Sequence, residues 1–445
     1  MKISKHQQVW RLAGPLILSN ISIALLGIVD TAVVGHLSQP YYLGAVAVAA
    51  VVFDFLYWGM GFLRMGTTGI VAQIYGKGDT DQLRTALTHA LLIALLIALL
   101  MLMLQGPLAN FAFFLIGGSE QVIAHARIYF NWAIWGAPAV LSSMALFGWL
   151  LGMQNARATL YYAISVNVIN IILDLLFVFE FNMGVKGVAL ASVLAQYSGV
   201  VIAIYLVRNE LRANPGQWHL ELIANLKKLM LMLALNRNIF IRTLCLIFVF
   251  AFFARQGAMQ GDVILAANAV LLNFQALMAL GLDGFANASE ALVGKAIGAN
   301  DRIGFKQAVH SATLWSFIIA LLFSLFYWLA GEQVIGLMTS IPAVKDMALV
   351  YLPWLILSPL ICVWCFLLDG IFIGAMRGVE MRNSMLLSTF AVFVPAWYVF
   401  QTLGNHGLWL AFLVFFVARG MSLGWFYRDI ERRADGFVGA NQSAG

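Results

Sequence analysis

The sequence predicts an all-α polytopic membrane protein with about twelve transmembrane helices in two pseudo-symmetric six-helix bundles. Three observations support this fold class: an apolar composition, apolar runs long enough to cross a bilayer, and an internal repeat. Of the 445 residues, 62% are hydrophobic and 10% are charged, whereas about a quarter of the residues of a soluble domain are charged. A soluble protein of this composition would lack the polar surface that keeps it in solution.

Apolar runs of about 20 residues or more, each sufficient to cross about 30 Å of hydrocarbon, recur along the chain. A membrane β-barrel would instead show short segments of alternating polarity. The polar stretch RNELRANPGQWHLELIANLKK separates six runs from six more. The predicted spans are residues 9–37, 43–75, 84–114, 122–153, 158–181, 186–209, 229–258, 262–297, 304–331, 346–376, 383–403 and 405–428.

The basic residues predict the orientation of these spans. Lys and Arg gather at alternate ends, and the opposite ends carry mainly Arg127, Lys186, Arg255 and Lys345. The positive-inside rule then places both termini in the cytoplasm, which agrees with an even number of spans. We therefore expect an N-terminal six-helix bundle at residues 1–211, a cytoplasmic linker at 212–228, a C-terminal six-helix bundle at 229–430 and a cytoplasmic tail at 431–445.

The two halves of the sequence repeat each other at a shift of about 222 residues. The shift places the Gly-Lys-Gly-Asp run of 76–79 on the Gly-Ala-Asn-Asp run of 298–301, and Gly148 and Gly152 on Gly370 and Gly374. Chance similarity among apolar spans would match apolar letters and would not keep loop glycines and an aspartate in register. Because the shift covers six spans, the halves share one orientation, and such parallel repeats place a substrate site near mid-bilayer.

Polar side chains within the spans are candidate functional residues, because ionisable groups are costly in hydrocarbon. Asp30 lies deep in the first span, and Asp174 lies inside the fifth. Asn167, Asn170 and Asp174 are spaced i, i+3 and i+7, so they share one helical face. A row of carboxylate and amide oxygens suits a proton network or a hard cation. The alternative is a hydrogen-bonded cluster that only holds helices together.

Four stretches of the chain resemble the multidrug and toxic compound extrusion (MATE) family, and within it the DinF-like branch. They are LAGPLILSNISIALLGIVDTAVVGHL in the first span, FLRMGTTGIVAQIYGKGD, NVINIILDLLFVF in the fifth span, and LLDGIFIGAMRGVEMRNSM at the junction of the tenth and eleventh spans. The resemblance covers essentially the whole chain. It implies two six-helix bundles around a V-shaped cleft, and efflux of cationic or amphipathic compounds coupled to inward flow of protons or sodium ions.

The resemblance also bears on individual residues. It matches Asp30, Asn170 and Asp174 to the acidic site in the N-terminal half of the family. This match favours an ion-coupling role for these residues, and Asn167 lies on the same helical face. Two further positions match residues that line or complete the site in relatives: Tyr129 and Ser192.

The second half lacks a matching acidic site. Under the shift, Asp30 falls on Phe252 and Asp174 falls on Ala396. Another branch of the family binds its cation with carboxylates of the seventh, eighth and tenth spans, and the seventh span of this chain contains no Asp or Glu. Asp369 in the tenth span stays a candidate auxiliary residue that lines the site, and a helix-end or packing role is its alternative.

Together these observations predict a secondary active multidrug efflux transporter that works by alternating access in a bacterial or archaeal plasma (inner) membrane. Its expected partners are cationic or amphipathic small molecules and membrane lipid, without nucleic acid, and the expected state is a monomer. We expect no cofactor. An Asp–Asn cluster accommodates either a proton or Na⁺, and we favour protons, because burial favours the neutral form of a carboxyl group.

Other functions lack their usual residues. The sequence contains no HExxH, GxSxG or Walker motif, so zinc proteolysis, serine hydrolysis and ATP-driven pumping are not expected, and we predict no enzymatic activity. The cysteines fall within apolar runs, and we expect no metal site. A flippase or exporter of a lipid-linked or metabolite substrate on the same fold stays the main alternative, and a channel comes third.

Overall fold

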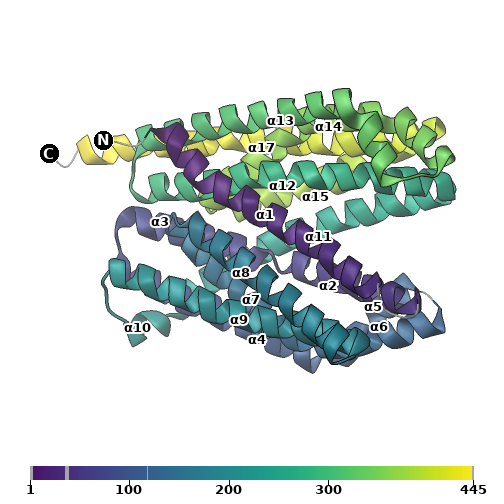
Figure 1. Cartoon of the computed structure of the whole chain (residues 1–445). Helices are drawn as coiled ribbons and strands as arrows, with labels where there is room; N and C mark the ends of the chain where they lie inside the picture. The colour runs from purple at the N-terminus through teal and green to yellow at the C-terminus, as the bar shows by residue number, and fades with distance from the viewer. Residues whose placement is uncertain (1–3, 36–39, 118, 443–445) are drawn as a thin grey trace. The chain divides into compact units, whose positions relative to one another are not determined.

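The computed structural model describes residues 4–35, 40–117 and 119–442 (Figure 1), without the side chains of residues 28, 30–32, 34, 35, 40 and 433–442. Over these ranges all regular structure is helical, and twelve helical segments are long and apolar enough to cross a membrane. The predicted all-α fold with twelve spans is therefore confirmed.

The helices of the first half follow the predicted apolar runs, but three runs that were predicted as continuous are interrupted. The second run, 43–75, breaks between Gly59 and Phe62, the fourth run, 122–153, contains a 3-10 turn at Ile134–Gly136, and the third run differs most. A continuous span over residues 84–114 was expected, but α4 ends at Met103 and a separate helix follows. The reason is Pro107, which has no N–H to donate to the carbonyl of Met103 and would clash with it. The elements are α1 (Lys5–Gly35), α2 (Pro40–Gly59), α3 (Phe62–Lys77), α4 (Thr80–Met103), α5 (Gln105–Ile116), α6 (Glu120–Ala133), η1 (Ile134–Gly136), α7 (Ala137–Gly152), α8 (Ala156–Leu175), η2 (Leu176–Glu180) and α9 (Gly184–Ala213).

A short helix, α10 (Leu220–Ile223), follows the first six spans in the sequence. Hydrogen bonds connect this part of the chain to α4. The Arg84 guanidinium donates to the carbonyls of Leu211, at 3.1 Å, and Asn214, at 3.0 Å. The Nε2 atom of His89 lies 2.8 Å from the carbonyl oxygen of Ile223. Two buried polar side chains of one membrane helix thus hold the connecting segment.

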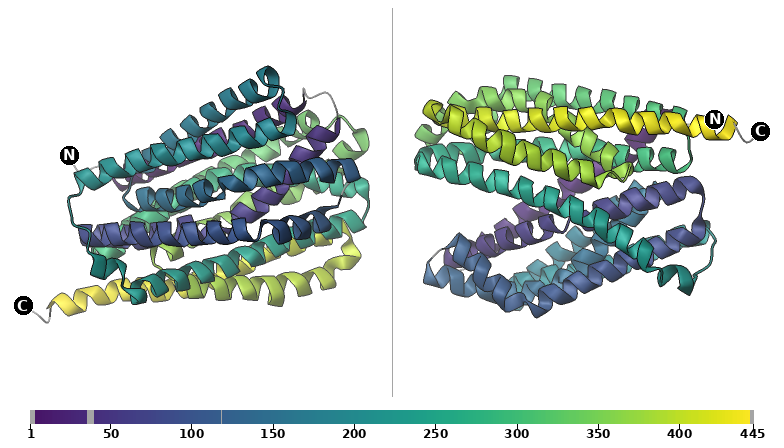
Figure 2. Two further views of the ribbon diagram at one scale, coloured as in Figure 1. Left: turned by 90° about the horizontal axis from the view of Figure 1, so that it is seen from below. Right: turned by 180° about the vertical axis from the view of Figure 1, so that it is seen from behind.

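The second half repeats the helical order of the first. Its fifth span contains a π-helical segment, η3, as the corresponding span of the first half does in η2. The last helix, α17, packs against α14 and α13, and Figure 2 shows it in yellow from two further sides. The elements are α11 (Leu226–Met259), α12 (Asp262–Gly298), α13 (Arg302–Met338), α14 (Pro342–Gly374), α15 (Gly378–Leu386), η3 (Leu387–Phe393), α16 (Val394–Phe400), η4 (Gln401–Leu403) and α17 (Asn405–Gln442).

The repeated loop motif has the same backbone geometry in both halves. Gly78 and Asn300 occupy equivalent positions and adopt left-handed φ angles of 74° and 52°. The next residue caps the following helix: Asp79 accepts the N–H of Gln82 at 3.0 Å, and Asp301 accepts that of Gly304 at 2.8 Å. The repeat in the sequence therefore encodes a turn followed by an N-cap, which satisfies one of the free N–H groups of the helix.

The repeated glycines mark two equivalent helix crossings. A Cβ atom on Gly148 would collide with the carbonyl oxygen of Arg64 on α3, and one on Gly370 would collide with that of Ala286 on α12. One turn later, a Cβ on Gly152 or on Gly374 would lie 3.0 Å from a backbone nitrogen of the same neighbouring helix. Glycine thus permits the close approach of α7 to α3 and of α14 to α12, as small residues do between membrane helices.

Contacts divide the chain into two compact units, Leu18–Leu233 and a second unit formed by Met1–Ile17 with Ala234–Gly445. The first turns of α1 therefore pack with the second half of the sequence. The Trp10 ring lies edge-on to Phe285 and to Trp315, each at a centroid distance of 5.2 Å. Each unit has its own apolar core, around Trp149 in the first and around Trp409 in the second.

Candidate functional site

The polar face of α8 is buried, although α8 crosses an apolar span. Asn167, Asn170 and Asp174 are 7%, 2% and 0% exposed. Asn167 donates through Nδ2 to the hydroxyl of Ser22 on α1 at 2.7 Å, and Asn170 donates through Nδ2 to the hydroxyl of Ser192 on α9 at 3.3 Å. The residues that share a face by spacing thus also connect α8 to two neighbouring helices.

Asp174 occupies the end of this face, where the helix changes its geometry. The α-helical part of the span ends at Leu175, and the π-helical segment η2 follows directly. Single π turns within α-helices occur often at functional sites, because they alter the direction of the side chains on either side. A carboxyl group enclosed at this place is either neutral or stabilised by hydrogen-bond donors, and a proton-coupled site requires a switch between such states.

Tyr129 on α6 borders an apolar part of the same unit. It packs with the buried side chains of Val33, Val178 and Val188. Its ring also lies 6.3 Å from that of Phe53. Val178 belongs to η2, so Tyr129 lies near the segment that follows Asp174.

Asp30 belongs to α1, but its side chain lies outside the described part of the structure. The backbone of α1 is helical through this position, and Ser22, which contacts Asn167, lies two turns earlier on the same helix. The structure therefore joins α1 to α8 through Ser22 and does not describe the contacts of the Asp30 carboxylate.

Asp369 lies in the other unit and has a different environment. Its Oδ2 atom accepts hydrogen bonds from the guanidinium groups of Arg242 on α11 and Arg419 on α17. Asp369, Arg242 and Arg419 are 7%, 7% and 3% exposed. One carboxylate thus links three helices, an arrangement that suits the packing role considered for Asp369.

Sequence reasoning did not single out Ser22, Arg242 or Arg419. Ser22 is one of several small polar residues in the first span, and its spacing alone does not select it. The two arginines could have been identified from the sequence. Both lie within predicted spans, and a charged residue in a span requires a partner whether it is basic or acidic. Applied to basic as well as acidic residues, the same rule would have identified both.

Comparisons with known proteins agree with this architecture. The profile of the MatE family matches residues 15–176 and again residues 238–398, which is one match in each half. The DNA damage-inducible protein F of Escherichia coli strain K12 is 43% identical over 442 residues, which cover 98% of this chain and 95% of that protein. The multidrug resistance protein NorM of Photobacterium profundum is 22% identical and covers 97% of both chains.

Solved structures share the fold over almost the full length. A multidrug resistance MATE family transporter in an outward-facing conformation superposes with a TM-score of 0.88, at 20% identity and with coverage of 98% of this chain and 97% of that one. A transporter of the MOP superfamily from Pyrococcus furiosus gives a TM-score of 0.87 at 19% identity, with the same coverage. With its two family matches and its twelve membrane-spanning helices, the chain belongs to the MATE family of multidrug and toxic compound extrusion transporters.

Proposed function

We propose that this transporter exports cationic or amphipathic small molecules by alternating access, and that inward proton flow through the N-terminal bundle drives the export. The observation that carries the proposal is the buried polar face of α8. Asp174 belongs to this face and is fully buried inside a membrane span. Ionisable groups in such positions mark ion pathways by default, because burying them is costly. The name of one relative, a multidrug resistance protein, supports drug export as the broader function.

In this proposal Asp30 and Asp174 exchange the proton, and Asn167 and Asn170 on the same face respond to it. A protonated carboxyl group donates a hydrogen bond that the carboxylate cannot donate. The hydrogen-bond partners around the two acids therefore differ between the charge states, and this difference biases the arrangement of α1 and α8. Tyr129, which packs beside η2, then borders the coupling site.

The driving force is sufficient for export. One proton that moves down a gradient of about one pH unit and 100 mV releases on the order of 3 to 4 kcal/mol. This free energy supports a several-hundred-fold concentration of an uncharged amphipathic cargo when one proton enters per molecule. Na⁺ is the alternative coupling ion, because the same oxygens suit a hard cation.

The proposal includes the organisation of the chain. Residues 1–211 and 229–430 supply the two bundles, although the first turns of α1 pack with the second half of the sequence. Residues 212–228 form a cytoplasmic linker, and residues 431–445 form a cytoplasmic tail. The transporter acts as a monomer in the plasma membrane of a bacterium or archaeon. Ion coupling belongs to the first bundle, Ser192 and Tyr129 line its site, and both bundles contact the cargo.

Accumulation of a cationic dye in everted vesicles, in which efflux runs from the medium into the lumen, tests the proposal when it is driven separately by a proton gradient and by a Na⁺ gradient. We expect efflux with the proton gradient alone. Asp174→Asn should reduce this efflux to the level of vesicles without the protein, because Asn keeps the volume but cannot be protonated. Asp30→Asn should have an equal effect.

Glu180→Gln provides the matched control, since Glu180 is an exposed acid on η2, six residues after Asp174. It should retain wild-type efflux. Proton-driven efflux by a normally inserted Asp174→Asn variant would contradict the coupling role. An absence of dye efflux in the wild type under both gradients would instead favour the flippase or metabolite exporter on the same fold.

A further inference from the structure

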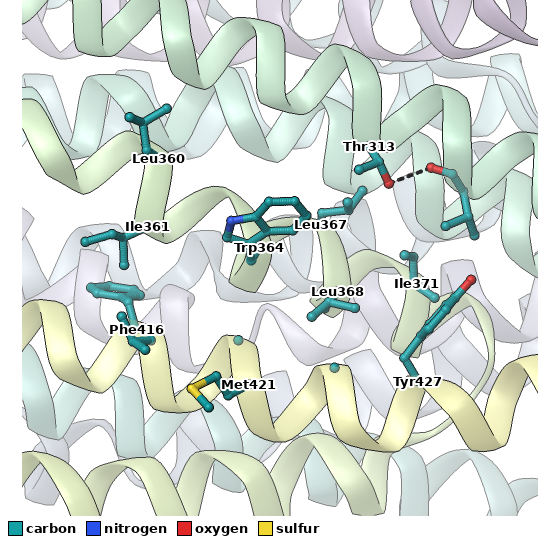
Figure 3. Close-up of a pocket in the computed structure, with 14 residues that line it drawn as sticks. Thr313, Leu360, Ile361, Trp364, Leu367, Leu368, Ile371, Phe416, Met421 and Tyr427 are labelled. Carbon is teal, nitrogen blue, oxygen red and sulfur yellow. Dashed lines mark hydrogen bonds between the residues drawn. The ribbon is translucent and has the colours of Figure 1, made fainter.

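An apolar groove runs along the outside of three helices in the second unit (Figure 3). Its volume is about 520 Å³, and its walls come from α13, α14 and α17. This volume lies within the range of about 300–1,000 Å³ that is usual for ligand sites. The lining is apolar apart from the indole nitrogen of Trp364 and the hydroxyls of Thr313 and Tyr427, and Thr313 donates its hydroxyl to the carbonyl of Val309 at 2.8 Å.

The groove faces away from the core of its own unit. Two lining residues, Trp364 on α14 and Met421 on α17, are 45% and 71% exposed. All three helices are membrane spans, so at this depth their exposed apolar side chains contact hydrocarbon. A depression in such a surface is filled by lipid or by another apolar molecule.

The length and position of the groove match one leaflet. On α17 it extends from Phe416 to Tyr427, which is about 16 Å at roughly 1.5 Å per residue. Half of a hydrocarbon core of about 30 Å is roughly 15 Å. The span of α17 runs over Asn405–Arg432, so the groove occupies the half of the span next to Arg432.

An arginine and an ion pair lie near the end of the groove at the membrane face. Arg428 lies one turn beyond Gly424 on the groove side of α17, and its guanidinium lies 6.0 Å from the ring centroid of Trp425. Lys306, at the start of α13, lies 3.3 Å from Glu431. An arginine at the mouth of an apolar groove is a suitable partner for a phosphate, because guanidinium groups bind phosphate oxygens in pairs.

We propose that this groove binds an acyl chain of an anionic phospholipid and that Arg428 pairs with its phosphate. The apolar walls hold the chain along half of the membrane, and the charge at the mouth selects the headgroup. This site is separate from the ion-coupling site and does not depend on the identity of the cargo.

Two glycines of α17 give the groove its depth. A Cβ atom on Gly424 would meet nothing within 4 Å, and one on Gly420 would lie 3.4 Å from the Cβ of Trp364. Gly424→Leu would therefore fill the groove without a clash with neighbouring backbone. Gly106→Leu is the matched control, because a Cβ on Gly106 in α5 also meets nothing within 4 Å.

Native mass spectrometry of the full chain, titrated with phosphatidylglycerol and with phosphatidylcholine of identical chains, tests the site. The wild type should retain one phosphatidylglycerol at a several-fold lower lipid concentration than phosphatidylcholine. Arg428→Gln should remove this preference and leave phosphatidylcholine binding unchanged. Gly424→Leu should lose both, whereas Gly106→Leu should bind as the wild type does.

Photo-crosslinking of the wild type in vesicles provides a second measurement that does not depend on a variant. A phosphatidylglycerol with a diazirine in its chain should label peptides that contain residues 360–371 and 416–427. Equal retention of both lipids by the wild type, unchanged binding in Gly424→Leu, or labelling elsewhere would overturn the proposal. Displacement of the lipid by transported dye, with loss of efflux in Gly424→Leu, would assign the groove to cargo instead.

Discussion

Asp79 and Asp301 begin equivalent helices, and each accepts a backbone N–H three residues later. The residue before each cap tolerates a left-handed backbone for a different reason. Gly78 has no Cβ atom, and Asn300 belongs to the few residue types that adopt this region with a side chain. The two halves therefore share a backbone geometry more closely than they share residues.

Substitution of either cap should destabilise the protein by a similar amount. Asp79→Ala and Asp301→Ala each remove one acceptor from a helix N-terminus, and the expected loss is about 1 kcal/mol. Thermal unfolding of the purified protein measures the effect. Ser at the same positions keeps an acceptor and should recover most of the stability. A large loss at one position beside none at the other would contradict the equivalence of the two loops.

Asp369→Asn should lower stability strongly. It leaves Arg242 and Arg419 buried beside an amide that cannot balance their charge, and breaking a buried ion pair in this way costs about 3–5 kcal/mol. Thermal unfolding should show the loss, and Asp369→Asn with Arg242→Met should regain part of it. Glu380→Gln breaks the half-buried pair with Arg377 and serves as control. Wild-type unfolding of Asp369→Asn would show that the cluster does not support the fold.

The sequence predicted the polar face of α8 but not the partners of Asp369. The i, i+3, i+7 spacing placed Asn167, Asn170 and Asp174 on one face, because a helix fixes that geometry locally. The partners of Asp369 were not predicted, because Arg242 and Arg419 lie 127 and 50 residues away along the chain. Which helices meet at a given depth depends on packing over the whole bundle, and spacing within one helix contains no information on it.

At the scale of elements, the close crossings of α7 with α3 and of α14 with α12 follow from glycines that face a neighbouring backbone. The sequence repeat identified these glycines but not their neighbours. The long apolar runs also predicted the number of membrane spans, because each run is long enough to cross the bilayer. The break between α4 and α5 was missed because hydropathy stays high through Leu104, and only the proline at 107 signals the interruption.

Gly148→Ala and Gly370→Ala should both be destabilising. Each added methyl group would press on a backbone carbonyl, and overpacking of this kind typically costs about 1–3 kcal/mol. Gly106→Ala, where the methyl group meets open space, should be neutral or slightly stabilising, because alanine favours the helix. Unfolding curves of the three variants give the comparison. Equal stability of all three would refute the close crossing of both helix pairs.

At the scale of the whole molecule, the division into units does not coincide with the middle of the sequence. Helix α1 contributes its first turns to the unit that contains the second half and the rest to the unit of the first half. A break in the connecting segment would therefore leave the two fragments associated through one helix. Trp10 contributes to this association through its ring contacts with Phe285 and Trp315.

Proteolytic cleavage tests this expectation. A protease site introduced within residues 215–219 should yield two fragments that co-purify in mild detergent. Trp10→Ala removes two edge-on ring contacts, each contributing about 0.5–1.5 kcal/mol beyond burial, and should make the fragments separate more readily. Trp328→Ala, at an exposed tryptophan of α13, should not. Immediate separation of the cleaved wild type would contradict the packing of α1 with the second unit.

The early position of Trp10 in the chain has a consequence for biosynthesis. Its ring partners emerge from the ribosome about 275 and 305 residues later, which corresponds to roughly 15–60 s at the usual rates of about 5–20 residues per second. During that time the first helix is already in the membrane without the surface on which it finally packs. The segment synthesised first thus reaches its native contacts among the last, and its apolar face is available to lipids or to insertion factors until α12 and α13 have been made.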